Sequence, residues 1–300
     1  MSRFENKVAL VTGAASRIGR AVAERIASEG GAVVVADIED DLGATVAQSI
    51  VAGGGRSVYR HLDVSSEAEW EETIAETVDT SGALGILVNN AGIAHPDLIE
   101  GTATELYDRV IAVSQTRVFL GQRAASSALK VSGYGSVVNV SSMFGIVGGF
   151  GSAPAYAAAK GAVRTLSKNT AVALAREGVR VNSVHPGFID TPTLGDQGRE
   201  RMATLTPMGR LGTSDEVAGL IAFLASDEAS FITVGSTSWT ADTPRSKPVE
   251  PQAIFCLDEF GPLDLQPYQG GRRRQTQVCT PGEDGSRRHR VMPWPARHTR

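Results

Sequence analysis

The sequence is poor in cysteine and has no long hydrophobic run. Its two cysteines, Cys256 and Cys279, both lie near the C-terminal end of the 300 residues. A disulfide framework therefore does not hold the main part of the chain, which fits a reducing cytoplasm. The first apolar run, residues 8–11, is too short for a signal peptide, and none approaches the roughly 18 apolar residues of a membrane span. We expect a cytoplasmic protein.

Acidic residues outnumber basic ones in the main part of the chain, whereas basic residues outnumber acidic ones in the last 58 residues. Residues 243–300 hold ten Lys or Arg against six Asp or Glu, a net charge of +4, which leaves −8 for residues 1–242. An acidic main part argues against nucleic-acid binding there. With 42% hydrophobic and 21% charged residues, the composition is ordinary for a globular protein with a sizeable core.

Short apolar runs alternate with segments of helical periodicity. The runs predict strands at 7–12, 32–36, 56–62, 84–88, 135–140 and 179–184, and the segments between them predict helices at 20–29, 40–51, from 65 onward, within 103–129 and at 154–176. Such alternation predicts an α/β domain, a Rossmann-like doubly wound parallel sheet with helices on both faces. Ligands of such sheets bind beyond the carboxyl ends of the strands.

A glycine turn follows the first predicted strand. Residues 13–19 read Gly-Ala-Ala-Ser-Arg-Ile-Gly and precede a helix, an arrangement in which backbone N–H groups and the helix dipole attract a pyrophosphate. An ordinary strand-to-helix connection is the alternative interpretation. Asp37 favours the nucleotide, because it ends the second strand roughly 20 residues further on, where a carboxylate accepts hydrogen bonds from a ribose diol.

Tyr156 and Lys160 stand four residues apart and so share one face of a predicted helix. A nearby ammonium favours the phenolate, so we expect Lys160 to lower the pKa of Tyr156 and make it usable as a base. Ser142 follows the fifth predicted strand and is placed to hold the same substrate oxygen. Alone, a Tyr-x-x-x-Lys pair also occurs on ordinary surface helices.

Together these motifs resemble those of classical short-chain dehydrogenases/reductases. The likeness runs from about Lys7 to Asp242 and includes Asp63-Val64, Asn89-Asn90-Ala91-Gly92 and Pro186-Gly187 to Thr191. The resemblance implies an NAD(P)-dependent alcohol dehydrogenase or ketone reductase with a doubly wound fold. It also implies a dimer or tetramer built on the two long helices.

The resemblance further implies roles for individual residues. Tyr156 is the general acid/base, Ser142 binds the substrate oxygen, and Lys160 holds the nicotinamide ribose. Ser114 takes a place in a proton relay. The implied cofactor-binding residues are Gly13, Ser16, Arg17, Ile18, Gly19, Asp37, Asp63, Val64, Asn89, Ala91, Gly92, Pro186, Gly187, Ile189 and Thr191, with Tyr156 and Lys160. No metal site is predicted.

Three positions depart from the family pattern. Arg17 replaces the middle glycine of the turn, where it either crowds the pyrophosphate or pairs with phosphate. A carboxylate facing a 2′-phosphate is a like-charge contact, so Asp37 favours NAD over NADP. Ser114 replaces an asparagine, and we expect weakened turnover. Arg117 replaces a small residue on a helix that packs closely, a risk to stability unless the side chain reaches solvent.

The segment 243–300 differs in composition from the rest of the chain. It holds eight of the thirteen prolines together with two arginine clusters, 272–274 and 287–288. Such sequence is expected to be an irregular, disordered tail. A basic arm that binds nucleic acid or anionic lipid, a tail without function, and a reading-frame change between Thr233 and Thr243 are the open interpretations.

Apolar residues follow Ser142 and Pro186 and predict a pocket for a hydrophobic alcohol or ketone, with core or lid packing as the alternative. They include Phe144, Ile146, Val147, Phe150, Phe188, Leu194 and Met202. Cyclic alcohols and hydroxysteroids are the substrate classes we expect. The competing hypothesis is a dinucleotide-binding protein of the same fold with little or no catalysis.

Overall fold

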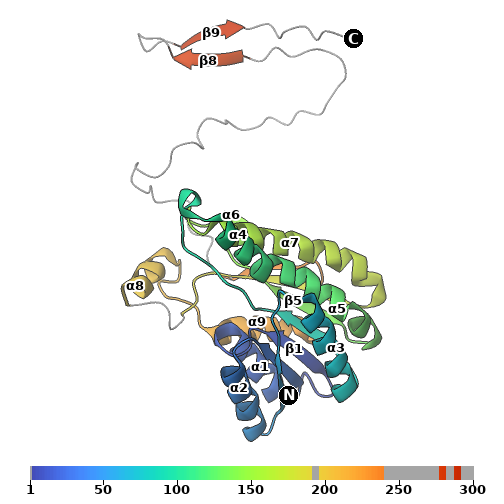
Figure 1. Ribbon diagram of the computed structural model, residues 1–300. Coiled ribbons are helices and arrows are strands. Elements are labelled where there is room, and N and C mark those ends of the chain that lie inside the picture. The colour runs from blue at the N-terminus through green and yellow to red at the C-terminus, as the bar shows by residue number, and fades with distance from the viewer. Residues whose placement is uncertain (1, 191–195, 240–276, 282–286, 292–300) are drawn as a thin grey trace, which may run out of the picture. The chain divides into compact units, whose positions relative to one another are not determined.

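The computed structural model describes residues 2–190, 196–239, 277–281 and 287–291. The chain divides into two compact units, Met1–Ser246 and Lys247–Arg300. The first unit contains a seven-stranded sheet with helices packed against it (Figure 1). In the part of the chain that the structure describes, no helix is long and apolar enough to cross a membrane.

All neighbouring strands of the seven-stranded sheet pair in parallel. Their order across the sheet is β3-β2-β1-β4-β5-β6-β7. Their bounds are β1 Val8–Thr12, β2 Ala32–Asp37, β3 Arg56–His61, β4 Ile86–Asn89, β5 Ser136–Val140, β6 Arg180–Pro186 and β7 Ser236–Trp239. The predicted parallel sheet is confirmed, and the strand order changes direction between β1 and β4.

Helices connect the strands and lie on both faces of the sheet (Figure 1). They are α1 Arg17–Ser28, α2 Asp40–Ala52, α3 Glu67–Ser81, α4 Thr104–Ile111, α5 Arg117–Val131, α6 Phe144–Val147, α7 Pro154–Leu174, α8 Asp196–Leu205 and α9 Ser214–Ala225. The Ser66 hydroxyl accepts a hydrogen bond from the Glu69 backbone at the start of α3 and so caps this helix.

Alternate residues of the strands feed two hydrophobic cores. Ala9 and Val11 of β1 pack with apolar residues of α1, α2 and α9 on one face. Leu10, between them, packs with residues of α3, α5 and α7 on the other. Because successive side chains of a strand point to opposite faces, a strand covered on both sides must be apolar throughout. All residues of β1 are buried accordingly.

The long helix predicted within residues 103–129 is interrupted in the structure. A π-helical turn, Ala112–Thr116, separates α4 from α5. Such turns occur frequently at functional sites. Here the turn contains Ser114, one of the predicted site residues.

Helix α5 lies unusually close to the sheet at Gly121. A Cβ atom on this residue would stand 2.6 Å from Trp70 and 2.8 Å from Oδ1 of Asn89. The absence of a side chain therefore allows α5 to approach both the buried indole of α3 and the end of β4. Gly121 sets the spacing between this helix and a predicted cofactor-binding residue.

The described residues of the second unit form a two-stranded antiparallel sheet. Strand β8, Gln277–Pro281, pairs with β9, Arg287–Val291. These two strands are the part of the predicted irregular tail that the structure describes. Most of residues 240–300, on which the other interpretations of the tail depend, lie outside the described residues.

Candidate active site

The predicted site residues gather at the carboxyl edge of the sheet. Because the strands are parallel, the residues at or just after their C-terminal ends lie on one edge. Those residues are Gly13, Asp37, Asp63, Asn89, Ser142 and Pro186. The adjacent strands β1 and β4 mark the point where the strand order reverses, which is where doubly wound sheets bind ligands.

The glycine turn between β1 and α1 packs tightly against the segment after β4. Gly13 has a φ of 64°, and a Cβ there would stand 2.7 Å from Cα of Ala91. A Cβ on Gly19 would stand 2.0 Å from the Gly13 carbonyl oxygen. Side chains at either position would push the turn away from Ala91, so both glycines are needed for this close approach.

The Thr12 hydroxyl joins β1 to the segment after β4. It accepts hydrogen bonds from the backbone N–H groups of Asn90, at 3.0 Å, and Ala91, at 3.1 Å, and donates to the Val88 carbonyl at 3.3 Å. The Asn90 amide also donates to the Gly13 carbonyl at 3.2 Å. These contacts hold the two loops of the strand-order reversal together.

Arg17 adopts the left-handed backbone conformation, with a φ of 51°, at the first residue of α1. A side chain in this region costs about 1–2 kcal/mol relative to the right-handed conformation, and a glycine would not incur that cost. The side chain is exposed, and Ser16 precedes it as the N-cap residue of α1. The substitution at this position therefore preserves the shape of the turn and strains its backbone.

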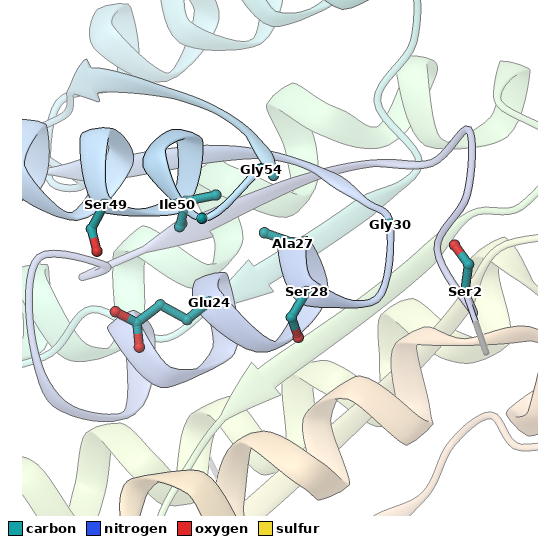
Figure 2. Close-up of a pocket in the computed structure, with 10 residues that line it drawn as sticks. Ser2, Glu24, Ala27, Ser28, Gly30, Ser49, Ile50 and Gly54 are labelled. Carbon is teal, nitrogen blue, oxygen red and sulfur yellow. The ribbon is translucent and has the colours of Figure 1, made fainter.

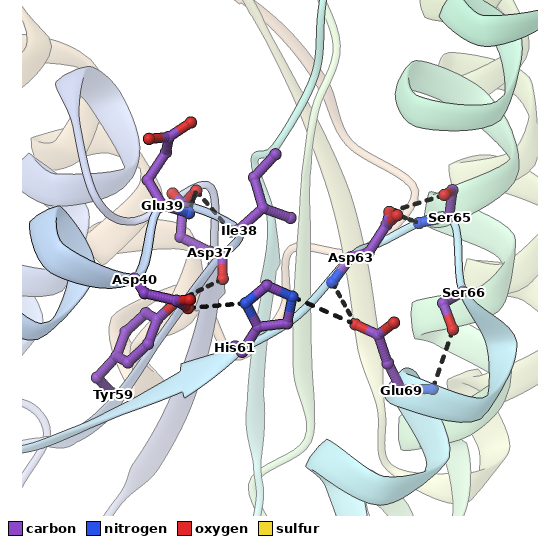
Figure 3. Close-up of polar contacts among 10 residues, drawn as sticks. All are labelled: Asp37, Ile38, Glu39, Asp40, Tyr59, His61, Asp63, Ser65, Ser66 and Glu69. Atoms are coloured by element: carbon purple, nitrogen blue, oxygen red, sulfur yellow. Dashed lines mark hydrogen bonds and ion pairs between the residues drawn. The ribbon is translucent and has the colours of Figure 1, made fainter.

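Both carboxylate oxygens of Asp37 accept backbone hydrogen bonds (Figure 3). Oδ2 accepts from Ala15 at 2.9 Å, and Oδ1 accepts from Ile38 at 2.8 Å and Glu39 at 3.2 Å. The carboxylate is thus fixed between the glycine turn and the start of α2. A carboxylate has about four acceptor positions, so it retains one for a ribose hydroxyl.

A second polar cluster lies beside Asp37 at the ends of β2 and β3 (Figure 3). The Asp40 carboxylate accepts a hydrogen bond from the Tyr59 hydroxyl at 2.6 Å and lies 2.7 Å from Nδ1 of His61. These contacts lower the pKa of Asp40, and the Asp40 carboxylate raises the pKa of His61. Sequence analysis missed this cluster, although Tyr59 and His61 stand at alternate positions of a predicted strand.

Asp63 and Val64 follow β3 and are held by α3. The Asp63 carboxylate accepts from the Ser65 backbone at 2.8 Å, and the Asp63 backbone donates to Glu69 at 2.6 Å. The Trp70 indole donates to the Val64 carbonyl at 3.0 Å. Val64 is buried. The segment after β3 that contains Val64 is therefore held in a fixed position by α3.

Asn89, at the end of β4, belongs to a buried polar chain. Its amide donates to Asn139 at 2.9 Å, and the Asn139 amide donates to Ser167 at 2.8 Å. Among the described residues, Oδ1 of Asn89 has no hydrogen-bond partner. A buried acceptor of this kind is costly, and it suits a site that a polar ligand completes. Asn139 was not predicted as a residue of the site, although the side-chain amide of an asparagine within a buried strand requires a hydrogen-bond partner.

Tyr156 and Lys160 lie one turn apart on α7, as predicted. The ammonium nitrogen of Lys160 is 5.4 Å from the centroid of the Tyr156 ring and donates a 2.7 Å hydrogen bond to the Val140 carbonyl. The side chain of Ser142 lies near that of Tyr156 and opposes the rise in the pKa of the phenol. The neighbouring Ser141 hydroxyl instead donates to the Lys160 carbonyl at 2.7 Å. The geometry brings Ser142, Tyr156 and Lys160 together and directs Ser141 away.

The expected lowering of the Tyr156 pKa by Lys160 is wrong. Burial raises the pKa of Tyr156, while the Ser142 side chain and the charge of Arg117 oppose that rise. Lys160 is itself buried, which holds its own pKa well below the usual value, and the charge of Arg117 adds to this effect. The charge of Arg117 is thus a cause that lowers the pKa of the phenol.

Ser114 is buried on the π-helical turn and bonds to the backbone after Gly92. Its hydroxyl donates to the Ile93 carbonyl at 2.8 Å and accepts from the Ile93 N–H at 3.0 Å. The hydroxyl thus acts both as donor and as acceptor in holding this loop. The proton-relay role implied for Ser114 stays a prediction.

Arg117 lies inside the molecule and does not reach solvent. Its relative exposure is 0%, and none of its three guanidinium nitrogens has a hydrogen-bond partner among the described residues. A Cβ on Gly92 would stand 3.4 Å from Nζ of Lys160, 3.5 Å from Oγ of Ser114 and 3.7 Å from Nη2 of Arg117. These three polar groups therefore surround one point at the edge of the site.

An aromatic cluster borders Tyr156. The Phe144 ring contacts the rings of Tyr156 and Phe150 edge-on at centroid distances of 6.3 and 6.0 Å. The Phe150 ring stacks on Phe188 at 6.0 Å, with Phe150 about half exposed. The loops after β5 and β6 thus meet through apolar rings next to the phenol, which favours the predicted hydrophobic pocket over a purely internal core.

The end of β6 carries the remaining predicted cofactor residues. The Pro186 carbonyl accepts from Met143 at 3.0 Å, and Gly187 follows it. Ile189 is buried and pairs with Gly212. Thr191 and Leu194 lie outside the described residues.

His185 precedes Pro186 within β6 and is structural. Its Nε2 lies 3.0 Å from the Ser183 hydroxyl and 2.9 Å from that of Ser236, and burial lowers its pKa to about 4. Its ring is therefore neutral at pH 7. These contacts join β6 to β7 beside the Pro186 segment.

The amino edge of the sheet has a separate groove (Figure 2). It lies between the ends of α1 and α2 and is lined by residues such as Ser2, Glu24, Gly30 and Ile50. Gly30 precedes β2, so the groove is on the edge opposite the residues described above. It contains none of the predicted site residues.

The carboxyl edge fits a nicotinamide dinucleotide. The tight turn at Gly13 opens α1, the fixed carboxylate of Asp37 ends β2, and the unpartnered Oδ1 of Asn89 lies further along. These groups suit a pyrophosphate, a ribose diol and a polar ring substituent in turn. The Tyr156 phenol and the Ser142 hydroxyl lie at the same edge of the sheet.

Comparison with known proteins agrees with this arrangement. Residues 13–238 match the model of the family described as enoyl-(acyl carrier protein) reductase. Among curated relatives, the 2,5-dichloro-2,5-cyclohexadiene-1,4-diol dehydrogenase LinX of Sphingobium indicum is 41% identical, the cyclopentanol dehydrogenase of Comamonas sp. 40%, and the NADP-dependent (R)-specific alcohol dehydrogenase of Lentilactobacillus kefiri 41%. Each alignment covers 77% of this chain and 94% of the relative.

A solved structure shares the fold. The crystal structure of a dehydrogenase/reductase from Sinorhizobium meliloti 1021 matches with a TM-score of 0.74 and 34% identity, over 79% of this chain and 95% of that chain. The family match, the sequence identities and the common fold agree with one another. The chain therefore belongs to the short-chain dehydrogenase/reductase family.

Proposed function

We propose that this protein interconverts a hydrophobic cyclic secondary alcohol and its ketone, with NAD as the preferred cofactor and Tyr156 as the general acid/base. As a member of its family, the chain is an alcohol oxidoreductase. The observation that carries the finer proposal is the meeting of Ser142, which follows β5, with Tyr156 and Lys160, one turn apart on α7, at the carboxyl edge of the sheet. Two adjacent hydroxyl groups there can hold one substrate oxygen between them.

Each residue has a distinct task in alcohol oxidation. Ser142 orients the substrate hydroxyl, and the Tyr156 phenolate accepts its proton while the carbinol carbon loses a hydride and becomes a carbonyl carbon. The bound nicotinamide supplies the hydride acceptor, or the donor in the reverse direction. Lys160 donates to the Val140 carbonyl and so joins the first part of α7 to the end of β5. We propose that it also contacts the nicotinamide ribose. The Phe144, Phe150 and Phe188 rings provide apolar surface for the substrate ring.

The proposed preference for NAD rests on charge at the end of β2. Asp37, Glu39 and Asp40 stand together there, and the Asp37 carboxylate is fixed by backbone donors (Figure 3). A 2′-phosphate next to these carboxylates would be repelled. Arg17 opposes this effect, since its exposed guanidinium can pair with phosphate, and one relative is named as NADP-dependent. We judge that several carboxylates outweigh one arginine.

Cyclic substrates are proposed because two relatives are named for cyclic compounds, a cyclohexadienediol and cyclopentanol. Hydroxysteroids are a further cyclic class compatible with the aromatic cluster. We also propose a cytoplasmic dimer or tetramer, on family resemblance, which light scattering of the purified chain tests directly. The role of Thr191 in holding the carboxamide stays a prediction.

The deciding experiment measures oxidation of NADH and of NADPH against cyclic ketones and ketosteroids. We expect turnover that prefers NADH and falls about 10²–10⁴-fold in Tyr156→Phe. The matched control is Tyr107→Phe, which removes a hydroxyl from a partly exposed tyrosine on α4 and should leave turnover unchanged. Measurable NADH binding without any turnover would refute the proposal and favour a dinucleotide-binding protein that has lost catalysis.

A further inference from the structure

The buried guanidinium of Arg117 requires a negative charge that no neighbouring carboxylate provides. Arg117 has a relative exposure of 0% and no hydrogen-bond partner among the described residues. Guanidinium groups keep their proton at neutral pH, and a buried unpaired cation is strongly unfavourable. A partner that becomes negative during function would remove that cost.

The geometry places Arg117 next to the catalytic groups. Its Nη2 stands 3.7 Å from the position of a Cβ on Gly92, a point 3.4 Å from Nζ of Lys160. That ammonium lies 5.4 Å from the ring centroid of Tyr156. Helix α7, which carries both residues, packs against the π-helical turn that precedes Arg117. The guanidinium therefore lies on the side of the site where α7 carries Lys160.

The other groups near the phenol do not supply the compensating charge. Ser142 is neutral, His185 is buried in its neutral form, and burial disfavours the charged form of Lys160. No acidic side chain in the described part of the chain is among the causes of the pKa shifts of Arg117, Tyr156 or Lys160. The group whose charge acts favourably on Arg117 is Tyr156.

We propose that Arg117 is a positioning residue whose charge stabilises the phenolate form of Tyr156. The proposal rests on the proposed catalytic role of Tyr156 for its functional meaning. Its physical content, a charge interaction between the two side chains, holds whether or not a substrate is found. The small residue that is usual at this position carries no charge, so the proposed charge interaction is specific to this chain.

The test titrates Tyr156 in the full-length protein without cofactor. Tyrosinate absorbance is recorded against pH for the parent and for Tyr156→Phe, and their difference isolates this phenol from the other tyrosines. The same pair is made on Arg117→Met, which keeps a long side chain without charge. We expect the Tyr156 pKa to rise by about 1 unit in Arg117→Met, since a nearby opposite charge shifts a pKa by about 1–3 units.

Conservative and matched variants separate charge from packing. Arg117→Lys keeps a cation and should restore the parental titration at least in part, whereas Arg117→Gln serves as the neutral variant if Arg117→Met does not fold. Arg123→Met removes an arginine from the same helix, one that is exposed and paired with Glu67, and should not move the titration. A Tyr156 pKa that is the same in the parent, Arg117→Met and Arg117→Gln overturns the proposal.

The pH dependence of turnover supplies the functional readout. The acidic limb of the kcat profile for alcohol oxidation should shift to higher pH in Arg117→Met by the same amount as the tyrosinate titration. A protein that shows the titration shift and no turnover with any cyclic alcohol would support the charge interaction and refute the proposed function. Turnover with a cyclic alcohol, without a shift of the tyrosinate titration or of the kcat profile, would support the proposed function and refute the charge interaction.

Discussion

The Asp37 carboxylate accepts a 2.9 Å hydrogen bond from the backbone N–H of Ala15, so the residue that ends β2 fixes the glycine turn after β1. This contact gives Asp37 a structural task in addition to its proposed contact with ribose. Its charge and its acceptor function can be separated experimentally, because asparagine keeps one acceptor oxygen and loses the charge.

We expect Asp37→Asn to shift cofactor preference toward NADPH. Removing the carboxylate charge relieves the repulsion of a 2′-phosphate, and the ratio of kcat/KM for NADPH to that for NADH should rise at least tenfold, which corresponds to about 1.4 kcal/mol. Glu72→Gln is the control, since it removes an exposed charge on α3, away from the end of β2. An unchanged ratio in Asp37→Asn would show that the carboxylate does not determine the preference.

Replacing Arg17 with glycine should stabilise the protein. The φ of 51° at this residue costs a non-glycine residue about 1 kcal/mol or more, and we expect Arg17→Gly to raise the free energy of unfolding by up to about 1 kcal/mol in urea. Arg20→Gly, one turn further on in α1, should instead lower it by about 1 kcal/mol. Equal losses in both variants would contradict backbone strain at Arg17. Arg17→Gly should also weaken NADPH binding more than NADH binding.

Ser114→Ala should lower both stability and turnover. The variant leaves the N–H and carbonyl of Ile93 without their partner, which costs about 2 kcal/mol of unfolding free energy, and it frees the loop after Gly92. Thr77→Ala is the matched control, because Thr77 is a buried hydroxyl bonded within α3. It should lose stability while keeping turnover. Full activity in Ser114→Ala would show that the loop does not depend on this tether.

The stability of the protein should fall below neutral pH because of His185. Burial lowers its folded-state pKa to about 4, from 6.5, so between these values the unfolded chain binds a proton that the folded chain does not. Stability from this group is complete above pH 6.5 and is lost as the pH falls toward 4. The loss between pH 7.5 and 5 should be about 2 kcal/mol.

Urea unfolding at the two pH values tests this expectation. His185→Gln should lose less stability than the parent over the same interval, since glutamine does not titrate. His95→Gln, a change at a half-exposed histidine, should retain the parental loss. If His185→Gln and the parent respond equally to pH, another group is responsible.

The strands and their polar ends could be predicted because their signals are local. A buried parallel strand must be apolar throughout, as β1 is, and the residue after it stands at the carboxyl edge by topology alone. The capping serine of α3 and the glycines of the first turn are similarly local. The helical spacing likewise predicts that Tyr156 and Lys160 share one face of a helix, and the end of the fifth strand predicts that Ser142 lies at the carboxyl edge of the sheet.

The electrostatics of the site could not be predicted, since they depend on directions that sequence spacing does not specify. Lys160 points its Nζ to the Val140 carbonyl, and its burial holds its own pKa well below the usual value, which the spacing from Tyr156 does not reveal. The π-helical turn contains Ser114, whose bonds to the Ile93 backbone the sequence spacing does not specify. Arg117 had one usable signal, since it is three and four residues before Leu120 and Gly121 on the buried face of α5.

Gly121 has a consequence for how mutational surveys of this enzyme are interpreted. A side chain there would meet Trp70 on one side and the amide of Asn89 on the other. With Asn89 in its proposed place beside the cofactor, an alanine at position 121 is expected to lower cofactor affinity by displacing the Asn89 side chain. Position 121 would score as part of the binding site in a functional screen, and its neighbour Gln122, which bonds within its own helix, would not.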